Sequence, residues 1–545
     1  MGVAMEKKAQ HSAVLDSAHV GDIKGALGTV RLDDNAPRKS WWARIRTLLA
    51  IMGPGLIVMV GDNDAGGVST YAQAGQNYGT SLLWVLLLLI PVLMVCQEMV
   101  VRLGLVTGVG HARLIFQRFG KFWGAFSVGD LFILNFLTIV TEFIGISMAM
   151  TYFGVSEYIS VPVAALLLIL ITVTGSFRRW ESSMFVCIVL NFLVIPLAFM
   201  SHPHFGPMVR NTFVPSVQGG LNSNALLLII GLVGTTVAPW QLFFQQSNVI
   251  DKRLTPRWMK YERADTFIGA FVVIIGAAAI IAATAFAFQG TKAFGNFVDS
   301  ATVANLFAHH VSRVAGNVFA IVLLNASIIG AGAVTLSTSY AFGDVFGINH
   351  SLHRSFKDAK GFYIIYAAIV LVAAGIVLIP NAPLGLMTIL VQALAGVLLP
   401  SATVFLLILC NDKAVLGPWV NKPWQNVLGA IIVGVLTMLS LILAATTLFP
   451  NWNVTVLTEI LAGVLIVSLL VTGVFQVLRR GKAAERDSVE DLDRWTWRML
   501  PLDDLPKAMP SRGTAIGMLS LRAYLVIAVV LLVVKAIQLA LGHTV

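Results

Sequence analysis

The stretch Gly61-Asp62-Asn63-Asp64-Ala65-Gly66-Gly67-Val68 interrupts the first long hydrophobic segment of this chain. It places two carboxylates and three glycines where an apolar membrane helix would otherwise run. In a lipid bilayer, an interrupted helix is tolerated only where its freed backbone groups are buried in protein or line a water-filled cavity. An ionisable residue at that depth is costly and marks a functional position. The stretch therefore predicts a functional site inside a membrane protein.

The composition of the whole chain agrees with a membrane protein. Of its 545 residues 57% are hydrophobic and 12% are charged, and the mean hydropathy is +0.83. Soluble proteins carry roughly 25% charged residues. The cysteines, Cys96, Cys187 and Cys410, lie inside apolar runs without paired spacing, so they predict neither a disulfide framework nor a zinc site. Residues 1–46 are polar and basic, and they lack the apolar core of a cleavable signal peptide.

Apolar runs of about 20 residues, each long enough to cross a bilayer core of roughly 30 Å, recur along nearly the whole chain. We expect thirteen spans, with twelve as the alternative because Lys535 lies well inside the last one. The predicted spans are 47–78 (broken), 80–103, 123–153, 160–175, 183–201, 223–248 (broken), 264–288, 313–343, 362–380, 384–410, 425–449, 454–478 and 519–541.

The positions of the basic residues predict the orientation of these spans. With the N-terminus in the cytoplasm, the loops on the other side hold only Arg210, Lys292 and Arg313, as the positive-inside rule requires. This asymmetry accounts for the net charge of +10 without a nucleic-acid partner. We expect a multi-pass protein of a bacterial cytoplasmic membrane that contacts lipid and functions as a monomer.

A second interruption lies in the sixth predicted span, at Gly234-Thr235-Thr236-Val237-Ala238-Pro239-Trp240-Gln241. Proline lacks a backbone donor and clashes with the preceding helical turn. A lone proline or glycine in a membrane helix can be a mere kink or packing contact. The two breaks, however, lie five spans apart, at corresponding places in two five-helix halves. Such pairs indicate an inverted-repeat transporter with a site at the midplane, where unwound carbonyls favour a cation.

The two breaks also predict how the chain is organised. We expect an N-terminal cytoplasmic tail, two inverted repeats, two extra helices, a cytoplasmic linker and a last span, at 1–46, 47–201, 202–410, 411–480, 481–518 and 519–545, respectively.

Short motifs around the first break match those of a known family. The chain has Asp64-Ala65-Gly66-Gly67, then Gln73-Ala74-Gly75 and Tyr78-Gly79. These resemble the Asp-Pro-Gly-Asn, Gln-Ala-Gly and Tyr-Gly elements of the NRAMP family of divalent-metal transporters. Thr141-Glu142-Phe143-Ile144-Gly145 resembles the Glu-Phe-Leu-Gly element of the same family. The resemblance covers about residues 50–410 and implies an all-α membrane protein with the LeuT-like fold and additional C-terminal helices.

The chain departs from the family at two metal-binding positions. Gly67 stands where the family has a metal-binding Asn, and Ala238-Pro239-Trp240-Gln241 replaces its Met-Pro-His-Asn. Gln392 matches a family glutamine that contacts metal in one conformation, although a hydrogen bond between helices is an alternative role for it. Without the thioether and the imidazole, the chain looks like the NRAMP-related magnesium transporters, a divergent branch of the family.

This resemblance implies a site built from oxygen ligands. Carboxylate, carbonyl and water ligands suit Mg²⁺, Ca²⁺ and Mn²⁺, and Mg²⁺ keeps several of its waters. We expect Asp64 to be the one carboxylate ligand, joined by carbonyls near Gly61 and Thr235, the Gln392 amide and retained waters. The metal is a transported substrate, and no permanently bound cofactor is expected.

Four further positions are expected to shape that site. Gly67 and Ala238 should leave room for a partly hydrated ion, because they replace bulkier ligands. Gly66 and Pro239 are expected to be the residues that break the two helices.

The remaining polar residues bear on proton coupling. The family uses the glutamate matched by Glu142 in its proton route, but its companion aspartate is Ile139 here and its His is Trp240. Gln241 is expected near the site, and Asp62 is expected to face the intracellular vestibule rather than to be a second ligand. We therefore predict weak or absent proton coupling. A membrane potential of 100 mV already supplies about 4.6 kcal/mol to a divalent ion.

Three functions remain open at this point. The first is an importer of hydrated Mg²⁺ and Mn²⁺ that works by alternating access. The second is a proton-coupled transporter of Mn²⁺ or Fe²⁺, and the third is a LeuT-fold carrier of an organic solute. Asp64 disfavours the last for an amino acid, because its charge would repel a substrate carboxylate. No motif supports an enzyme.

Overall fold

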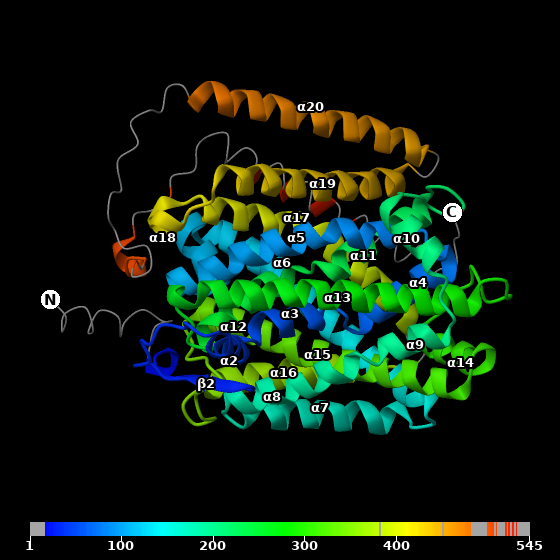
Figure 1. The fold of residues 1–545 in the computed structure, drawn as a ribbon, viewed down its shortest axis with the longest axis horizontal. Helices are drawn as coiled ribbons and strands as arrows, with labels where there is room; N and C mark the ends of the chain where they lie inside the picture. Colours follow the sequence, from blue (N-terminus) through cyan, green and yellow to red (C-terminus); the bar gives the residue numbers. More distant parts are fainter. Residues whose placement is uncertain are drawn as a thin grey trace.

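The structure, a computed structural model, describes residues 17–380, 383–449, 452–480, 497, 499–505 and isolated positions between 508 and 530. Most of these residues are helical (Figure 1). The first half begins with a short helical turn, η1 (Ser17–His19), and an antiparallel hairpin of β1 (Ile23–Gly25) and β2 (Gly28–Val30). The helices that follow are α2 (Trp41–Ile51), α3 (Pro54–Gly61), α4 (Ala65–Tyr78), α5 (Leu83–Thr107), α6 (His111–Tyr152), α7 (Glu157–Val173), α8 (Phe177–Asn191), α9 (Val194–Met200) and α10 (Phe205–Phe213).

The second half repeats the pattern of long apolar helices. Its elements are α11 (Ser223–Thr236), α12 (Pro239–Asp251), η2 (Pro256–Trp258), α13 (Met259–Phe288), α14 (Ser300–His310), α15 (Arg313–Phe346), α16 (Lys360–Val377), α17 (Leu384–Cys410), α18 (Lys413–Leu416), η3 (Gly417–Trp419), α19 (Pro423–Leu448), α20 (Val454–Arg480) and η4 (Leu502–Asp504). In Figure 1, α19 and α20 lie along one edge of the bundle and α7 and α8 along the opposite edge. The breaks lie among the helices between these edges.

Ten helices or helix pairs in the described part of the chain are long and apolar enough to cross a membrane. A bent pair, α2 with α3, would make an eleventh, and α7 is a shorter apolar helix. Most of the predicted last span, 519–541, and most of the predicted linker, 481–518, lie outside the described residues. The repeat boundaries at 47–201 and 202–410 remain predictions.

Two boundaries differ from the prediction. The helix expected to begin at 123 already begins at His111, and it bends at Gly120, whose φ is 84°. Basic and polar residues between these positions hid the helix from a search for apolar runs. The predicted first break, 61–68, is shorter in the structure, because helix resumes at Ala65. Gly66, expected to break the helix, therefore lies in the first turn of α4, whereas Pro239 does open α12.

The two broken spans have local causes in the sequence. Asp64 is the N-cap of α4, and its side chain accepts a hydrogen bond from the Gly67 backbone amide at 2.6 Å. Such a cap satisfies an amide that would otherwise lack a partner. In the second break, α11 ends at Thr236 and Pro239 starts α12, a position where proline's missing N–H costs nothing.

Buried polar contacts tie together the end of the bundle that carries the N-terminal hairpin, which is the predicted cytoplasmic end. The Asp265 carboxylate of α13 accepts hydrogen bonds from the backbone amides of Gly53, Gly55 and Leu56, at 3.0, 2.8 and 3.2 Å. It therefore caps α3 from a distant helix. The amide of Ala26, in the hairpin turn, donates to Glu181 Oε2 at 2.5 Å.

A buried ion pair also joins helices at this end of the bundle. Lys252, next to the end of α12, lies 2.6 Å from Glu181 Oε1, and both side chains are fully buried. Its Nζ also donates to the Met52 carbonyl at 2.8 Å. These contacts join α12, α8 and the start of α3, three elements that are far apart in the sequence.

A second cluster at this end surrounds Asp251, the last residue of α12. Its carboxylate accepts hydrogen bonds from Tyr340 and Ser351, both at 2.5 Å, and from the Leu352 amide at 2.9 Å. His350 lies nearby, with its Nε2 3.3 Å from Asp344 Oδ1.

The pKa values of His350 and His353, in the loop after α15, are shifted in opposite directions. Burial lowers the pKa of His350, but the hydrogen bond and charge of Asp344, with smaller contributions from the Ile348 carbonyl and Asp251, outweigh it. The pKa of His350 therefore lies above its ordinary value of 6.5. Burial lowers the pKa of His353 below its ordinary value.

Candidate cation site

Two carboxyl groups from different helices meet at the first break. Asp64, at the start of α4, is 3% exposed, and Glu142 of α6 is fully buried. Their carboxyl groups lie against each other. Two carboxylates in contact cannot both remain ionised without a cation or a proton between them. The pair is therefore suited to hold one or the other.

Gly330 of α15 makes this approach of two carboxyl groups possible. A Cβ at position 330 would lie 2.4 Å from Glu142 Oε2 and 2.9 Å from the Cβ of Asp64. Glu142 Oε2 also accepts a hydrogen bond from the Ala65 amide at 3.1 Å, whereas its Oε1 has no hydrogen-bond partner in the described chain. Three helices thus supply the carboxylates and the space between them.

Further oxygen atoms converge beside Gly67. A Cβ at this position would lie 2.5 Å from the Asp62 carbonyl oxygen and 3.0 Å from Thr235 Oγ1. The Thr235 hydroxyl is buried and has no partner among the described residues. The room that glycine leaves at position 67 is therefore filled by oxygen atoms in this conformation, whereas the sequence predicted open space for a hydrated ion.

Gln392 of α17 reaches the same turn of α4. Its Nε2 lies 1.6 Å from the point where a Cβ at Gly66 would be, so glycine is required for this approach. The Nε2 atom is buried without a hydrogen-bond partner in the part of the chain that the structure describes. Because the oxygen and nitrogen of an amide exchange places on a 180° rotation, the same side chain can present its carbonyl oxygen there.

Asp62 lies at the C-terminal end of α3 and is fully buried, and neither of its carboxylate oxygens has a partner within the described residues. Asp62 was expected to face an intracellular vestibule, but its side chain is not exposed in this conformation. Trp240 of α12 fills the neighbouring space, with its Cη2 3.1 Å from the point where a Cβ at Gly61 would lie. A buried carboxylate without a partner is costly and needs a proton or a cation.

The remaining predicted residues support the second break. Gln241 accepts a hydrogen bond from Gln97 at 2.8 Å and donates to the Thr236 carbonyl at 3.3 Å. The Thr236 hydroxyl is 2.8 Å from the Tyr71 hydroxyl of α4, which links the two broken helices directly. Ala238 is the N-cap of α12 and is 5% exposed.

The donors around the two breaks are oxygen and amide groups. In the described chain, no group of three or more His, Cys, Asp or Glu side chains could hold a metal ion. In the described residues the site is therefore not a cluster of three such side chains. Carboxyl, hydroxyl, carbonyl and amide groups suit hard divalent cations.

A wider cavity lies near the other end of α4. It has a volume of about 270 Å³, and Gln73, Asn77 and Asn224 are among its lining residues. Gly66, Gln73 and Asn77 are separated by seven and four residues, which places them on one face of α4. The face of α4 that carries the Gln392 contact thus also carries two polar residues that line the cavity.

Sequence reasoning missed two residues that matter here. Gly330 stands in an ordinary small-residue stretch of an apolar helix, and nothing in one sequence marks it. Asp130 of α6 also went unremarked, although an ionisable residue within an apolar segment is a signal in itself.

Comparison with known proteins agrees with the fold and the motifs. The family model described as natural resistance-associated macrophage protein-like matches residues 55–446. The divalent metal cation transporter MntH of Latilactobacillus sakei subsp. sakei is 27% identical over 466 residues, which are 81% of this chain and 98% of that protein. MntH of Ralstonia nicotianae is 29% identical over 438 residues, covering 75% and 92%.

A solved structure shows the same architecture. The Eremococcus coleocola manganese transporter, in complex with an aromatic bis-isothiourea substituted compound, superposes with a TM-score of 0.61 at 22% identity. The match covers 82% of this chain and 97% of that one. The predicted all-α, LeuT-like fold is confirmed. Because the family model matches well over half of this chain, the chain belongs to the NRAMP (natural resistance-associated macrophage protein-like) family.

Proposed function

We propose that this protein imports divalent cations, Mg²⁺ and Mn²⁺, across a cytoplasmic membrane by alternating access. The observation that carries the proposal is the meeting of the Asp64 and Glu142 carboxyl groups at a helix break. Buried carboxylates inside a membrane bundle are kept at a cost, and they mark ion or proton pathways. The relatives named as divalent metal cation transporters support the same class of cargo.

Selectivity for hard cations follows from the donor atoms. Asp64 would be the carboxylate ligand, with the Thr235 hydroxyl, the Gln392 amide and carbonyls near Gly61 completing the shell. Ala238 replaces the soft thioether donor that favours softer metals. Mg²⁺ and Mn²⁺ are both suited to oxygen ligands, so the proposal includes both.

The position of Glu142 favours a second candidate, proton-coupled transport of Mn²⁺ or Fe²⁺. A carboxyl group against the cation ligand can take up a proton when the cation arrives or leaves. Against strong coupling stand Trp240 and Ile139, neither of which can carry a proton. We therefore propose weak coupling, with the membrane potential driving uptake.

Uptake into proteoliposomes separates the two candidates. Purified protein is reconstituted, and internal metal and internal pH are followed together after Mg²⁺, Mn²⁺ or Ca²⁺ is added outside. The proposal expects Mg²⁺ to enter or to compete with Mn²⁺, and internal pH to stay steady. Acidification in proportion to metal entry, with Mg²⁺ excluded, would establish the second candidate instead.

The effect of a sulfur donor on cation selectivity can be tested at one residue. Ala238→Met restores a thioether beside the break, and we expect it to raise Mn²⁺ uptake relative to Mg²⁺. Ala238→Leu, which adds similar bulk without sulfur, is the matched control. A Gly67→Asn change is less clean, because its Cβ would lie 2.5 Å from the Asp62 carbonyl oxygen.

A further inference from the structure

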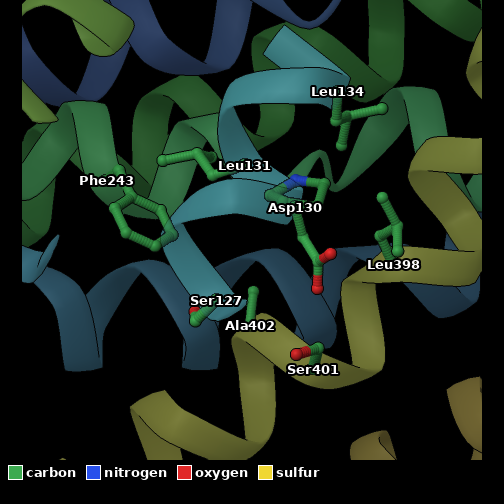
Figure 2. A pocket seen from close by; sticks show the side chains of 9 residues that line it. Ser127, Asp130, Leu131, Leu134, Phe243, Leu398, Ser401 and Ala402 are labelled. Carbon is green, nitrogen blue, oxygen red and sulfur yellow. The ribbon is translucent and has the colours of Figure 1, made fainter. Parts of the chain in front are cut away.

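A small cavity lies on the predicted cytoplasmic side of the carboxyl pair. Asp130, Ser127 and Leu134 of α6 line it, together with Pro239 of α12 and Ser401 of α17. Figure 2 shows the Asp130 carboxylate extending between α6 and α17, in the direction of Ser401. Pro239 is the first residue after the second helix break, so this cavity adjoins the candidate cation site. Asp130 lies twelve residues before Glu142 on the same helix, or about 18 Å along its axis.

We propose that Asp130 is a second cation-binding position, through which divalent ions pass after they leave Asp64. The inference rests on the proposed transport function and deepens it. Asp130 Oδ2 is buried and has no hydrogen-bond partner among the described residues. A carboxylate oxygen without a partner, in a cavity that also holds two hydroxyl groups, provides hard donors for a hydrated cation.

The rest of the route follows one face of α12. Pro239 and Phe243 line the Asp130 cavity, and Ser247 and Asp251 line a second one nearer the predicted cytoplasmic end. These positions are four residues apart and therefore lie along one helix face. The second cavity also includes Asp344, so it too offers carboxylates.

On this face of α12, Phe243 lies between Pro239 and the residues that line the second cavity. Its ring packs edge-on against the imidazole of His111, with ring centres 4.6 Å apart. His111 is in turn held by Gln246, at 2.8 Å between Nδ1 and Oε1. A movement of α12 that turns Phe243 aside would join the cavities. Each cavity has about 10 Å³ open to a water centre, which is room for one water, so a hydrated ion passes only after such a movement.

The other side of α12 offers no comparable route in this conformation. Trp240 lies against Gly61, and its ring is followed by Phe244 at 5.9 Å. Trp180 then packs on Phe244 at 6.0 Å. These rings pack in a column where α12 meets α8. The lining of the Asp130 cavity instead includes a carboxylate and two hydroxyl groups.

A purely structural role for Asp130 would be as the partner of Arg522. The Arg522 guanidinium instead lies over the rings of Phe122 and Phe126, at 3.8 and 4.0 Å. Among the described residues, no ion pair within 4.0 Å joins it to Asp130. The contacts of Arg522 with these rings therefore do not depend on Asp130.

The test is the initial rate of Mn²⁺ uptake by proteoliposomes containing the full chain, measured against external Mn²⁺ concentration. We expect Asp130→Asn to lower the maximal rate about tenfold without raising KM, because loading at Asp64 precedes exit. Asp130→Glu should retain most of the rate. Arg522→Gln is the control for the structural role and should not lower the rate. A wild-type maximal rate in Asp130→Asn, or an equal loss in Arg522→Gln, would overturn the inference.

A second pair of variants tests the cavity without touching the carboxylate. Ala402→Leu fills the cavity and should also lower the maximal rate, whereas Val404→Leu, two residues away and outside the lining, should not. Equal rates in these two variants would count against the route. If wild-type protein carries no Mn²⁺, the proposed function itself fails. If the wild type carries Mn²⁺ and Asp64→Ala does not, while Asp130→Asn matches the wild type, only the Asp130 inference fails.

Discussion

At the scale of single residues, glycines decide which polar atoms can meet. Gly330 lets the Asp64 and Glu142 carboxyl groups touch, Gly66 admits the Gln392 amide, and Gly67 admits two oxygen atoms. Each of these contacts would be lost if the glycine carried a side chain. The contacts between the polar groups of the site therefore depend on residues that have no side chain.

Gly330→Ala tests this dependence. The new methyl group would lie 2.4 Å from Glu142 Oε2, so one carboxyl group must move. Overpacking of this kind costs about 1–3 kcal/mol, and we expect weaker Mn²⁺ binding in calorimetry together with slower uptake. Gly332→Ala is the matched control, because its methyl group would meet Met184 at an ordinary 3.5 Å. Equal binding by the two variants would contradict the assigned role of Gly330.

At the scale of elements, the ends of the broken helices are held by side chains from distant parts of the chain. Asp265 of α13 caps α3, and Tyr71 of α4 contacts the end of α11. Neither contact follows from local sequence. Both hold a helix end in place near the site.

Asp265→Ala should destabilise the protein. It removes the acceptor for three buried backbone amides, and losing a helix cap costs about 0.5–2 kcal/mol. We expect a lower thermal unfolding midpoint in detergent. Asp299→Ala removes the N-cap of α14, which is less buried, and should lower the unfolding midpoint by a smaller amount. The role of Asp265 would be refuted if its variant unfolded at the wild-type temperature.

His350 predicts a pH dependence of stability. Its folded pKa is raised, so its pairing with Asp344 contributes fully below the ordinary value of 6.5 and is lost as pH rises through the folded pKa. We expect wild type to unfold at a higher temperature than His350→Gln below pH 6.5, and this difference to shrink as pH rises from 6.5 through the folded pKa of His350. His353, with its lowered pKa, acts with the opposite sign below 6.5. Thermal unfolding against pH measures the difference, and an advantage that grows with pH would contradict the pairing.

Both helix breaks and the residues in them could be predicted, because a carboxylate and a proline inside apolar runs are visible in one sequence. The early start of α6 at His111 could not be read from apolar runs, because its first turns are basic. The contact of Glu142 with Asp64 was also out of reach, since it depends on how α6 and α15 pack against α4. Open space at Gly67 was expected from side-chain size alone, but the turn at Asp62 places a carbonyl there.

At the scale of the whole molecule, the structure is closed at the end that carries the N-terminal hairpin. Lys252 and Glu181 join α12 to α8, and the hairpin adds its Ala26 amide. The cavity of about 270 Å³ at the other end of α4 is lined by two polar residues of the helix face that carries the Gln392 contact. The proposed alternating access requires these closing contacts to open in the other state.

Lys252→Met should weaken the closed state. It leaves Glu181 buried without its cation, and breaking a buried ion pair costs about 3–5 kcal/mol. We expect a lower unfolding midpoint and easier proteolysis of the hairpin. Adding Glu181→Leu should recover part of the loss, because the uncompensated charge is then removed. A double variant less stable than the single one would contradict this assignment.

Whether hard divalent cations cross the membrane through the Asp64 site can be measured as the initial rate of Mg²⁺ uptake into proteoliposomes under an inside-negative potential. Wild-type protein should take up Mg²⁺, and Mn²⁺ should compete with it. Asp64→Ala, folded by its unfolding curve, should reduce uptake to the rate of protein-free vesicles. Mg²⁺ transport through the Asp64 site would be contradicted by either of two results. One is Mg²⁺ uptake by Asp64→Ala at the wild-type rate, and the other is a wild-type protein that takes up Mn²⁺ but no Mg²⁺.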